Sequence, residues 1–135
     1  MMIVVYYKIT LNYYNENLFK VEILSDTKTI QIKNGEITSI KVILKNKTRK
    51  IISSENDIFL SYHITDKNSN IVQYENLRAI IDPINPFGIS NPINLEISPE
   101  LDPGEYLLQV DIVQEYVTWF SDKGNEVYTT ELIIN

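Results

Sequence analysis

The sequence predicts an all-β protein, an antiparallel two-sheet sandwich of the immunoglobulin or fibronectin-III type. Apolar and polar residues alternate with a period of two along most of the chain, which is the pattern of half-buried strands. Turn residues recur between these segments, as at Asn34-Gly35 and at Asp122-Lys123-Gly124. Tyr106 follows Pro103-Gly104 at the head of a long alternating segment, where sandwiches of this type place a tyrosine corner. No segment carries a helical stripe, so a fold of alternating strands and helices is not expected.

Eight strands are expected in order along the chain. The clearest are ITSIKVILKN and DIFLSYHIT, which alternate strictly. The expected strands cover residues 19–24, 28–33, 37–45, 57–65, 71–75, 92–98, 105–115 and 127–134. Residues 1–18 are assigned to an N-terminal strand or tail, and residues 19–135 to a single sandwich domain. DKNSN at 66–70 lacks the glycine and the distal glutamate of a calcium loop, so we interpret it as a hairpin turn.

The alternation also assigns side chains to faces. The residues expected in the core are Ile40, Leu60, Tyr62, Ile64, Leu108, Val110 and Ile112. Asp111 and Glu115 then point to the opposite face of their strand. In immunoglobulin-like sandwiches the strands at 57–65 and 105–115 are neighbours, so His63 is expected beside Gln109 and Asp111.

Composition excludes several functions. The 135 residues include 18 acidic and 12 basic side chains, a net charge of -6, which disfavours nucleic acid and anionic membranes as partners. There is no cysteine, which removes disulfides and thiolate metal sites and fits a reducing, cytoplasmic compartment. No apolar run reaches membrane-spanning length, so no membrane insertion is expected.

Two stretches resemble a known family. They are SYHITDKNSNIVQYENLRAIIDPINPFG and LDPGEYLLQVDIVQEYVTWFSDKG. Their pattern of Tyr-His, Leu-Arg, Pro-Gly-x-Tyr, Val-x-Glu and Trp-Phe resembles an immunoglobulin-like sandwich domain of bacterial cell-surface polysaccharide and glycosyltransferase systems. The matching positions are Tyr62, His63, Asp66, Tyr74, Glu75, Leu77, Arg78, Pro103, Gly104, Tyr106, Asp111, Val113, Glu115, Trp119 and Phe120. The chain departs from the family pattern at four positions, with Ser69, Asn76 and Tyr116 in place of glycine and Tyr74 in place of tryptophan. By analogy it is similar to the C-terminal carbohydrate-binding domain of polysaccharide ABC exporter ATPases.

Three residues of this pattern have both a structural and a functional interpretation. His63 is either bonded to an acid of the next strand or a ligand contact. Trp119 either stacks on a sugar ring or closes the end of the sandwich beside Phe120. Arg78 either forms an ion pair with Glu115 or Glu75, or clamps a ligand.

Nothing in the sequence demands catalysis. Asp111 and Glu115 lie about 13 Å apart on one strand at about 3.3 Å per residue, farther than the roughly 5 to 9.5 Å of glycosidase carboxylates. No cofactor or metal is expected. Our first hypothesis is a non-catalytic carbohydrate-binding module whose glycan contacts are His63, Tyr74, Arg78, Asp111, Glu115 and Trp119. The alternative is a docking domain that contacts an ATPase subunit, a glycosyltransferase or a second copy of itself, as a two-fold homodimer.

Overall fold

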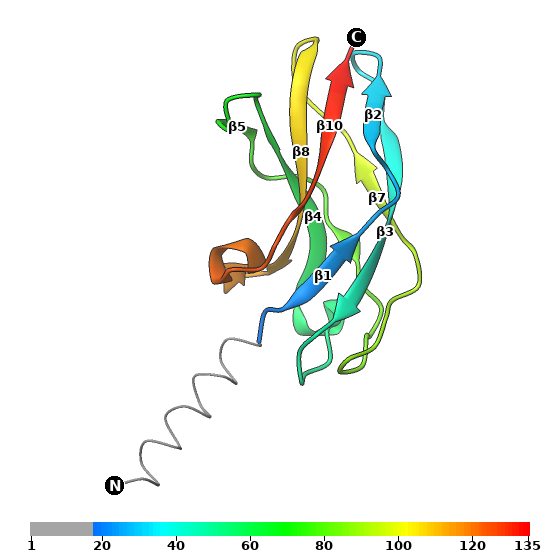
Figure 1. Cartoon of the computed structure of the whole chain (residues 1–135), viewed down its shortest axis with the longest axis vertical. Helices are drawn as coiled ribbons and strands as arrows, with labels where there is room; N and C mark the ends of the chain where they lie inside the picture. The colour runs from blue at the N-terminus through cyan, green and yellow to red at the C-terminus, as the bar shows by residue number, and fades with distance from the viewer. Residues whose placement is uncertain (1–17) are drawn as a thin grey trace, which may run out of the picture.

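The computed structural model describes residues 18–135, so the expected N-terminal strand or tail lies almost entirely outside the described residues. The chain forms two packed β-sheets, shown edge-on in Figure 1. One sheet has the order β1-β3-β7, built from Val21–Leu24, Thr38–Asn46 and Ile93–Ile97. The other has the order β2-β10-β8-β4-β5, built from Thr29–Ile32, Tyr128–Ile134, Gly104–Gln114, Ile58–Thr65 and Ile71–Gln73. The predicted fold class is confirmed: the chain is an immunoglobulin-like sandwich.

Two short strands extend the larger sheet where none was expected. β6 (Ala79–Ile80) pairs with β4, and β9 (Thr118–Trp119) pairs with β8. Two 3-10 helices, η1 (Ser54–Asn56) and η2 (Phe120–Lys123), complete the described elements. These pieces are too short for a period to be visible in the sequence.

The beginning of the sandwich is divided between the two sheets. β1 pairs antiparallel with β3, whereas β2 pairs parallel with β10 on the other sheet. All other strand pairs are antiparallel. Between β1 and β2 the hydroxyl of Ser25 donates to the carbonyl of Lys41 at 2.7 Å, which fastens the crossover. The alternation predicted both strands, but not that they belong to different sheets.

The core lies between the sheets and follows the predicted alternation. All seven residues expected there are buried: Ile40, Leu60, Tyr62, Ile64, Leu108, Val110 and Ile112. The Tyr62 hydroxyl, whose burial would be costly without a partner, accepts a hydrogen bond from the Ser98 amide at 2.9 Å. The face assignments of β3, β4 and β8 are therefore confirmed.

The tyrosine corner is also present. The Tyr106 hydroxyl donates to the carbonyl of Asp102 at 2.7 Å. This bond links the start of β8 to the turn before it, as the motif requires.

The turn at 66–70 is a hairpin between β4 and β5, as expected. The carboxylate of Asp66 accepts hydrogen bonds from the Asn70 amide at 2.9 Å and the Asn68 amide at 2.8 Å. The bonds from Asn70 hold the pKa of Asp66 below its ordinary value. Ser69 adopts a left-handed backbone with φ 68°, and Tyr116 does so with φ 64°. Both are positions at which the sequence departs from a glycine of the resembled pattern, and glycine would adopt this conformation at less cost.

Candidate functional site: a polar and aromatic cluster on the outer face of the larger sheet

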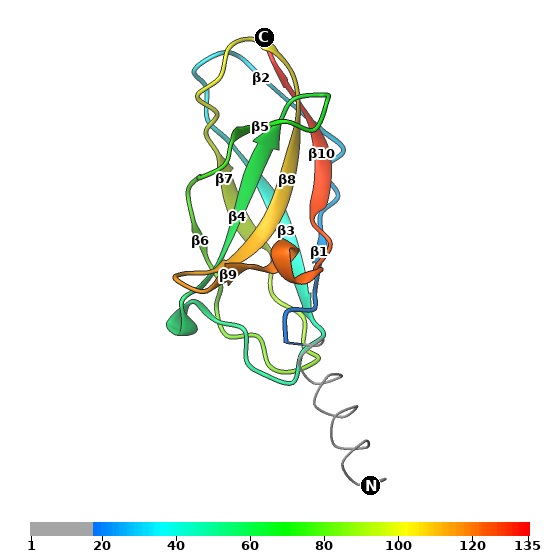
Figure 2. The same cartoon turned by 90° about the vertical axis from the view of Figure 1, so that its left-hand side faces the viewer.

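The outer face of β4 and β8 is covered at one end. Two segments lie over it, the strap of residues 74–78 between β5 and β6, and the chain from Tyr116 through β9 to η2. Figure 1 shows the β9–η2 chain, in orange, on the side of this sheet away from β1 and β3, and Figure 2 shows that side from the front. Asp111 is 0% exposed and His63 is 5% exposed. The acidic row predicted for the outer face does point outward from the core, but this part of it is buried.

The strand register brings His63 to Asp111 as predicted. His63 lies opposite Gln109, and Ser61 lies opposite Asp111. His63 Nε2 is 3.1 Å from Asp111 Oδ2, and His63 Nδ1 is 2.9 Å from the carbonyl oxygen of Tyr74. A carbonyl and a carboxylate both only accept hydrogen bonds. Nδ1 therefore donates to the Tyr74 carbonyl, and Nε2 shares a hydrogen bond with the Asp111 carboxyl group, so the two side chains form a buried hydrogen-bonded pair.

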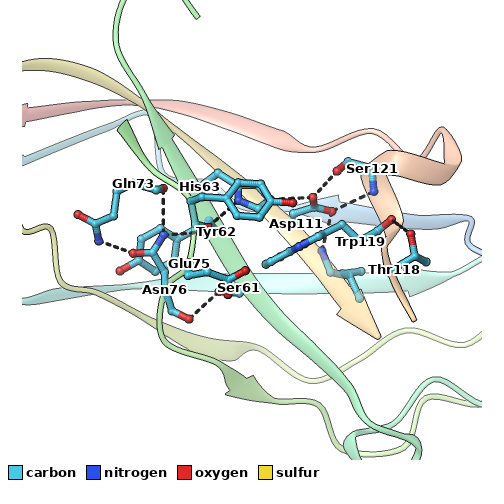
Figure 3. A network of polar contacts seen from close by, with 12 residues as sticks. Ser61, Tyr62, His63, Gln73, Glu75, Asn76, Asp111, Thr118, Trp119 and Ser121 are labelled. Atoms are coloured by element: carbon cyan, nitrogen blue, oxygen red, sulfur yellow. Dashed lines mark hydrogen bonds and ion pairs between the residues drawn. The ribbon is translucent and has the colours of Figure 1, made fainter. Parts of the chain in front are cut away.

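The Asp111 carboxylate connects β8 with η2. Oδ1 accepts from the Ile112 amide at 2.8 Å and from the Ser121 amide at 3.2 Å. Oδ2 accepts from His63 and from the Ser121 hydroxyl. Figure 3 shows Asp111 between His63 on one side and Ser121 on the other. Because all these donors point to one carboxylate, the buried negative charge is well compensated.

Serine, histidine and aspartate meet here, but not in the arrangement of a hydrolase. In a catalytic triad the histidine contacts the serine hydroxyl and removes its proton. Here the Ser121 hydroxyl donates to Asp111, and both nitrogens of His63 are occupied by other partners. The Ser121 hydroxyl is therefore bonded to the aspartate and not to the histidine.

Arg78 fastens the strap to the sheet. Its Nε donates to Glu115 Oε1 at 2.6 Å and its Nη2 donates to Glu75 Oε2 at 2.8 Å. Its Nη1 donates to the Ser61 hydroxyl at 3.2 Å and to the Asn76 carbonyl at 2.8 Å. Burial lowers the pKa of Arg78, but the two carboxylates outweigh it and the net shift is upward. The ion-pair interpretation of Arg78 is confirmed, with both candidate glutamates as partners.

Three aromatic rings fill the remainder of the cluster. The His63 ring stacks on Tyr74 with centroids 4.6 Å apart and meets Trp119 edge-on at 4.2 Å. The Arg78 guanidinium lies 5.0 Å from the centroid of the Trp119 ring, in cation–π geometry. Trp119 is buried, whereas Tyr74 is 40% exposed. Tyr74 is thus the aromatic ring of the cluster that reaches solvent.

All six residues predicted for the site are brought together, and most of their polar atoms bond to one another or to the backbone. Five further residues complete the network: Ser61, Gln73, Glu75, Asn76 and Ser121. Asn76 is the most informative, since its Nδ2 donates to the Tyr62 carbonyl at 2.8 Å and ties the strap to β4. The only sign of it in the sequence is its departure from the family glycine. In residues 18–135 no group of three His, Asp or Glu side chains is placed to hold a metal ion.

Exposed apolar side chains lie beside the cluster, along the β5–β6 edge of the larger sheet. We call them the edge strip: Ile71, Val72, Tyr74, Leu77 and Ile80. Ile80 is 70% exposed. It also lines a groove of about 320 Å³ together with Ile89 and Ile93, on the side of the sandwich where β6 approaches β7. In the described part of the chain no helix is long and apolar enough to cross a membrane.

Comparisons with known proteins support the fold. No protein-family model matches the chain, and no curated protein matches it. A β-glucosidase from Listeria innocua, solved in complex with glucose, matches with a TM-score of 0.56 and 12% identity over 86% of this chain and 16% of its own. Pseudomonas fluorescens alkylpurine DNA glycosylase AlkC, bound to DNA containing an abasic site analog, matches with a TM-score of 0.50 and 11% identity over 86% of this chain and 30% of its own.

A CARDB domain from Pyrococcus furiosus, in complex with di-metal ions, matches with a TM-score of 0.47 and 16% identity over 86% of each chain. Of the two larger proteins, the β-glucosidase and the glycosylase, this chain spans only a minor part. At these identities the likeness concerns the fold alone, and the activities of the larger proteins do not transfer with it.

Proposed function

We propose that the protein is a non-catalytic docking module that binds a partner protein through the edge strip. The observation that supports this best is the strip itself, because several large apolar side chains exposed along one edge of a folded domain are typical of an interaction site. An exposed sheet edge is, in addition, a surface on which an extended segment can add a strand. A cytoplasmic location and a partner from a polysaccharide system, such as a glycosyltransferase or transporter ATPase, belong to the same proposal.

The buried cluster has a structural role in this proposal, whereas the edge strip binds the partner. The Arg78, Asp111 and His63 side chains are engaged by partners inside the protein. Hydroxyls of a ligand would have to displace these bonds, which costs more than replacing water. We assign the cluster to holding the strap, and the strap carries Tyr74 and Leu77 of the edge strip.

Docking can be tested with a photo-reactive side chain at position 80. Ile80→p-benzoylphenylalanine, expressed in cells of the source organism, is expected to give one defined protein adduct on irradiation. The matched control is Ile37→p-benzoylphenylalanine, since Ile37 is also exposed but lies outside the strip. The captured protein, once purified, is expected to bind the Leu77→Ser/Ile80→Ser variant about tenfold more weakly than the unmodified chain. The same adducts at both positions, or equal affinity for both proteins, would contradict docking at the strip.

Glycan recognition is the second candidate, and Tyr74 is the observation that favours it. One face of its ring stacks on His63, so the exposed part includes the outer face. An aromatic face next to an exposed carboxylate, here Glu75, suits a sugar ring and its hydroxyls.

Titration calorimetry against the host's surface polysaccharide tests this candidate. A shallow site predicts a dissociation constant of about 10 µM to 1 mM. Tyr74→Ala is expected to weaken binding about tenfold, while Phe87→Ala, at another exposed aromatic, leaves it unchanged. Equal affinity of Tyr74→Ala and the unmodified chain would remove Tyr74 from any glycan site.

A further inference from the structure

We infer that the partner segment received by the edge strip is cationic, an extended stretch in which lysine or arginine alternates with apolar residues. This inference rests on the docking function proposed above and adds the chemistry of the partner. Its basis is the charge that surrounds the strip.

The charges of this chain are strongly segregated along the sequence. Residues 51–122 contain twelve acidic side chains and only two basic ones, Lys67 and Arg78. Both basic groups are already paired. Lys67 Nζ lies 3.8 Å from Glu131, and Arg78 bonds both Glu75 and Glu115. The half of the chain that forms the strip therefore presents a surplus of negative charge.

Several of these acids lie next to the strip itself. Asp82 lines the same groove as Ile80. The Glu75 side chain, on the strap, is 65% exposed. Glu100 is held near β5, because its amide donates to Gln73 Oε1 at 2.8 Å. The strip is thus an apolar surface with an acidic rim.

Burial and nearby carboxylates raise the pKa of Tyr74 in the strip and of the buried Tyr62 on β4. Burial raises the pKa of Tyr62, and the carboxylates of Glu96 and Glu100 raise it further, against the opposing hydrogen bond from Ser98. Burial also raises the pKa of Tyr74, and three carboxylates add to that shift, those of Asp122, Glu75 and Asp111. Nearby carboxylates disfavour the negative charge of a phenolate, and the same carboxylates favour a positive charge on a bound partner.

The same charges decide against a second copy as the occupant. A two-fold dimer through this edge would place the same acidic rim on both sides of the interface. Like charges facing each other at an interface are unfavourable. A cationic segment instead pairs with the acidic rim, and its apolar side chains meet Ile80 and Leu77. The groove beside Ile80 has room for an aliphatic side chain of the partner.

Synthetic peptides test this directly on the full chain. The probe is a fluorescein-labelled ten-residue peptide in which lysine and valine alternate. The control peptide has the same length and label, and glutamate replaces each lysine. We expect the lysine peptide to bind about tenfold tighter than the glutamate peptide at about 20 mM salt, measured by fluorescence anisotropy. Ile80→Ser and Asp82→Lys are each expected to weaken its binding about fivefold or more.

A control variant distinguishes the effect of an acid in the rim from the effect of the protein's net charge. Glu36→Lys makes the same charge change as Asp82→Lys at an exposed position of the turn between β2 and β3, and it is expected to leave lysine-peptide binding within about twofold. Equal losses in Glu36→Lys and Asp82→Lys would reduce the effect to net charge and overturn the inference. So would equal affinity for both peptides, or a concentration-dependent dimer in sedimentation that is lost in Ile80→Ser. A position-specific adduct at residue 80 alongside equal peptide affinities would leave docking standing and remove only the cationic partner.

Discussion

Asp111→Ala is expected to lower the free energy of unfolding by about 3 to 5 kcal/mol. The substitution removes a carboxyl group that is 0% exposed and leaves Nε2 of the buried His63 without its hydrogen-bond partner. The Ser121 amide and hydroxyl lose their acceptor at the same time. Breaking a buried pair from one side is costly because the remaining polar group stays buried without its partner. Urea denaturation near neutral pH, followed by Trp119 fluorescence and circular dichroism together, measures the change.

Two further variants make this result specific. Asp122→Ala removes an exposed carboxylate one residue after Ser121 and is expected to change stability by less than about 0.5 kcal/mol. His63→Leu combined with Asp111→Leu removes both members of the pair, and it is expected to be less destabilising than the sum of the single changes. A loss below about 1 kcal/mol in Asp111→Ala would mean that the cluster does not hold the strap and η2 to the sheet.

Ile112→Ala is expected to lower the free energy of unfolding by about 2 to 5 kcal/mol. Ile112 is completely buried on the core face of β8, opposite Leu60 of β4. Truncation removes apolar contacts and leaves a cavity in a close-packed interior, and the two costs add. The measurement is the same urea titration, with the transition midpoint and slope both recorded.

The matched control for Ile112 is Val117→Ala. Val117 lies in the turn between β8 and β9 and is exposed, so its truncation is expected to change stability by less than about 0.5 kcal/mol. If Ile112→Ala and Val117→Ala had equal effects, the assignment of Ile112 to the core face of β8 would be wrong. If the slope of the Ile112→Ala titration changed, two-state unfolding would need to be examined first.

The resemblance on which the first hypothesis rests concerns the residues of the buried cluster. Its Tyr-His, Leu-Arg, Val-x-Glu and Trp-Phe positions supply His63, Arg78, Glu115 and Trp119, which contact one another in the structure. In this chain these residues are therefore accounted for by a structural role, in which the strap and η2 are fastened to the sheet. Whether the pattern also accompanies a shared ligand stays a prediction, to be decided by the calorimetry on Tyr74→Ala.

Local patterns were sufficient for much of this fold. The alternation at residues 57–65 and 105–115 predicted which side chains of β4 and β8 enter the core, because successive side chains of any strand point to opposite faces. The tyrosine corner at Tyr106 was predictable for a similar reason, since its partner Asp102 lies only four residues away. Even the approach of His63 to Asp111 followed from strand neighbours and a period of two.

The sequence by itself determined the fold class, the faces of the long strands and the residues that gather around His63. Only the tertiary structure decided that the strap and η2 cover that face, which turned a row of apparently solvated side chains into a buried network. It also decided that β2 joins β10 and that the edge strip is left open to solvent. The physical reason is the range of the forces involved. A strand's periodicity is local, whereas burial depends on which distant segment, without any period of its own, is available to pack over each face.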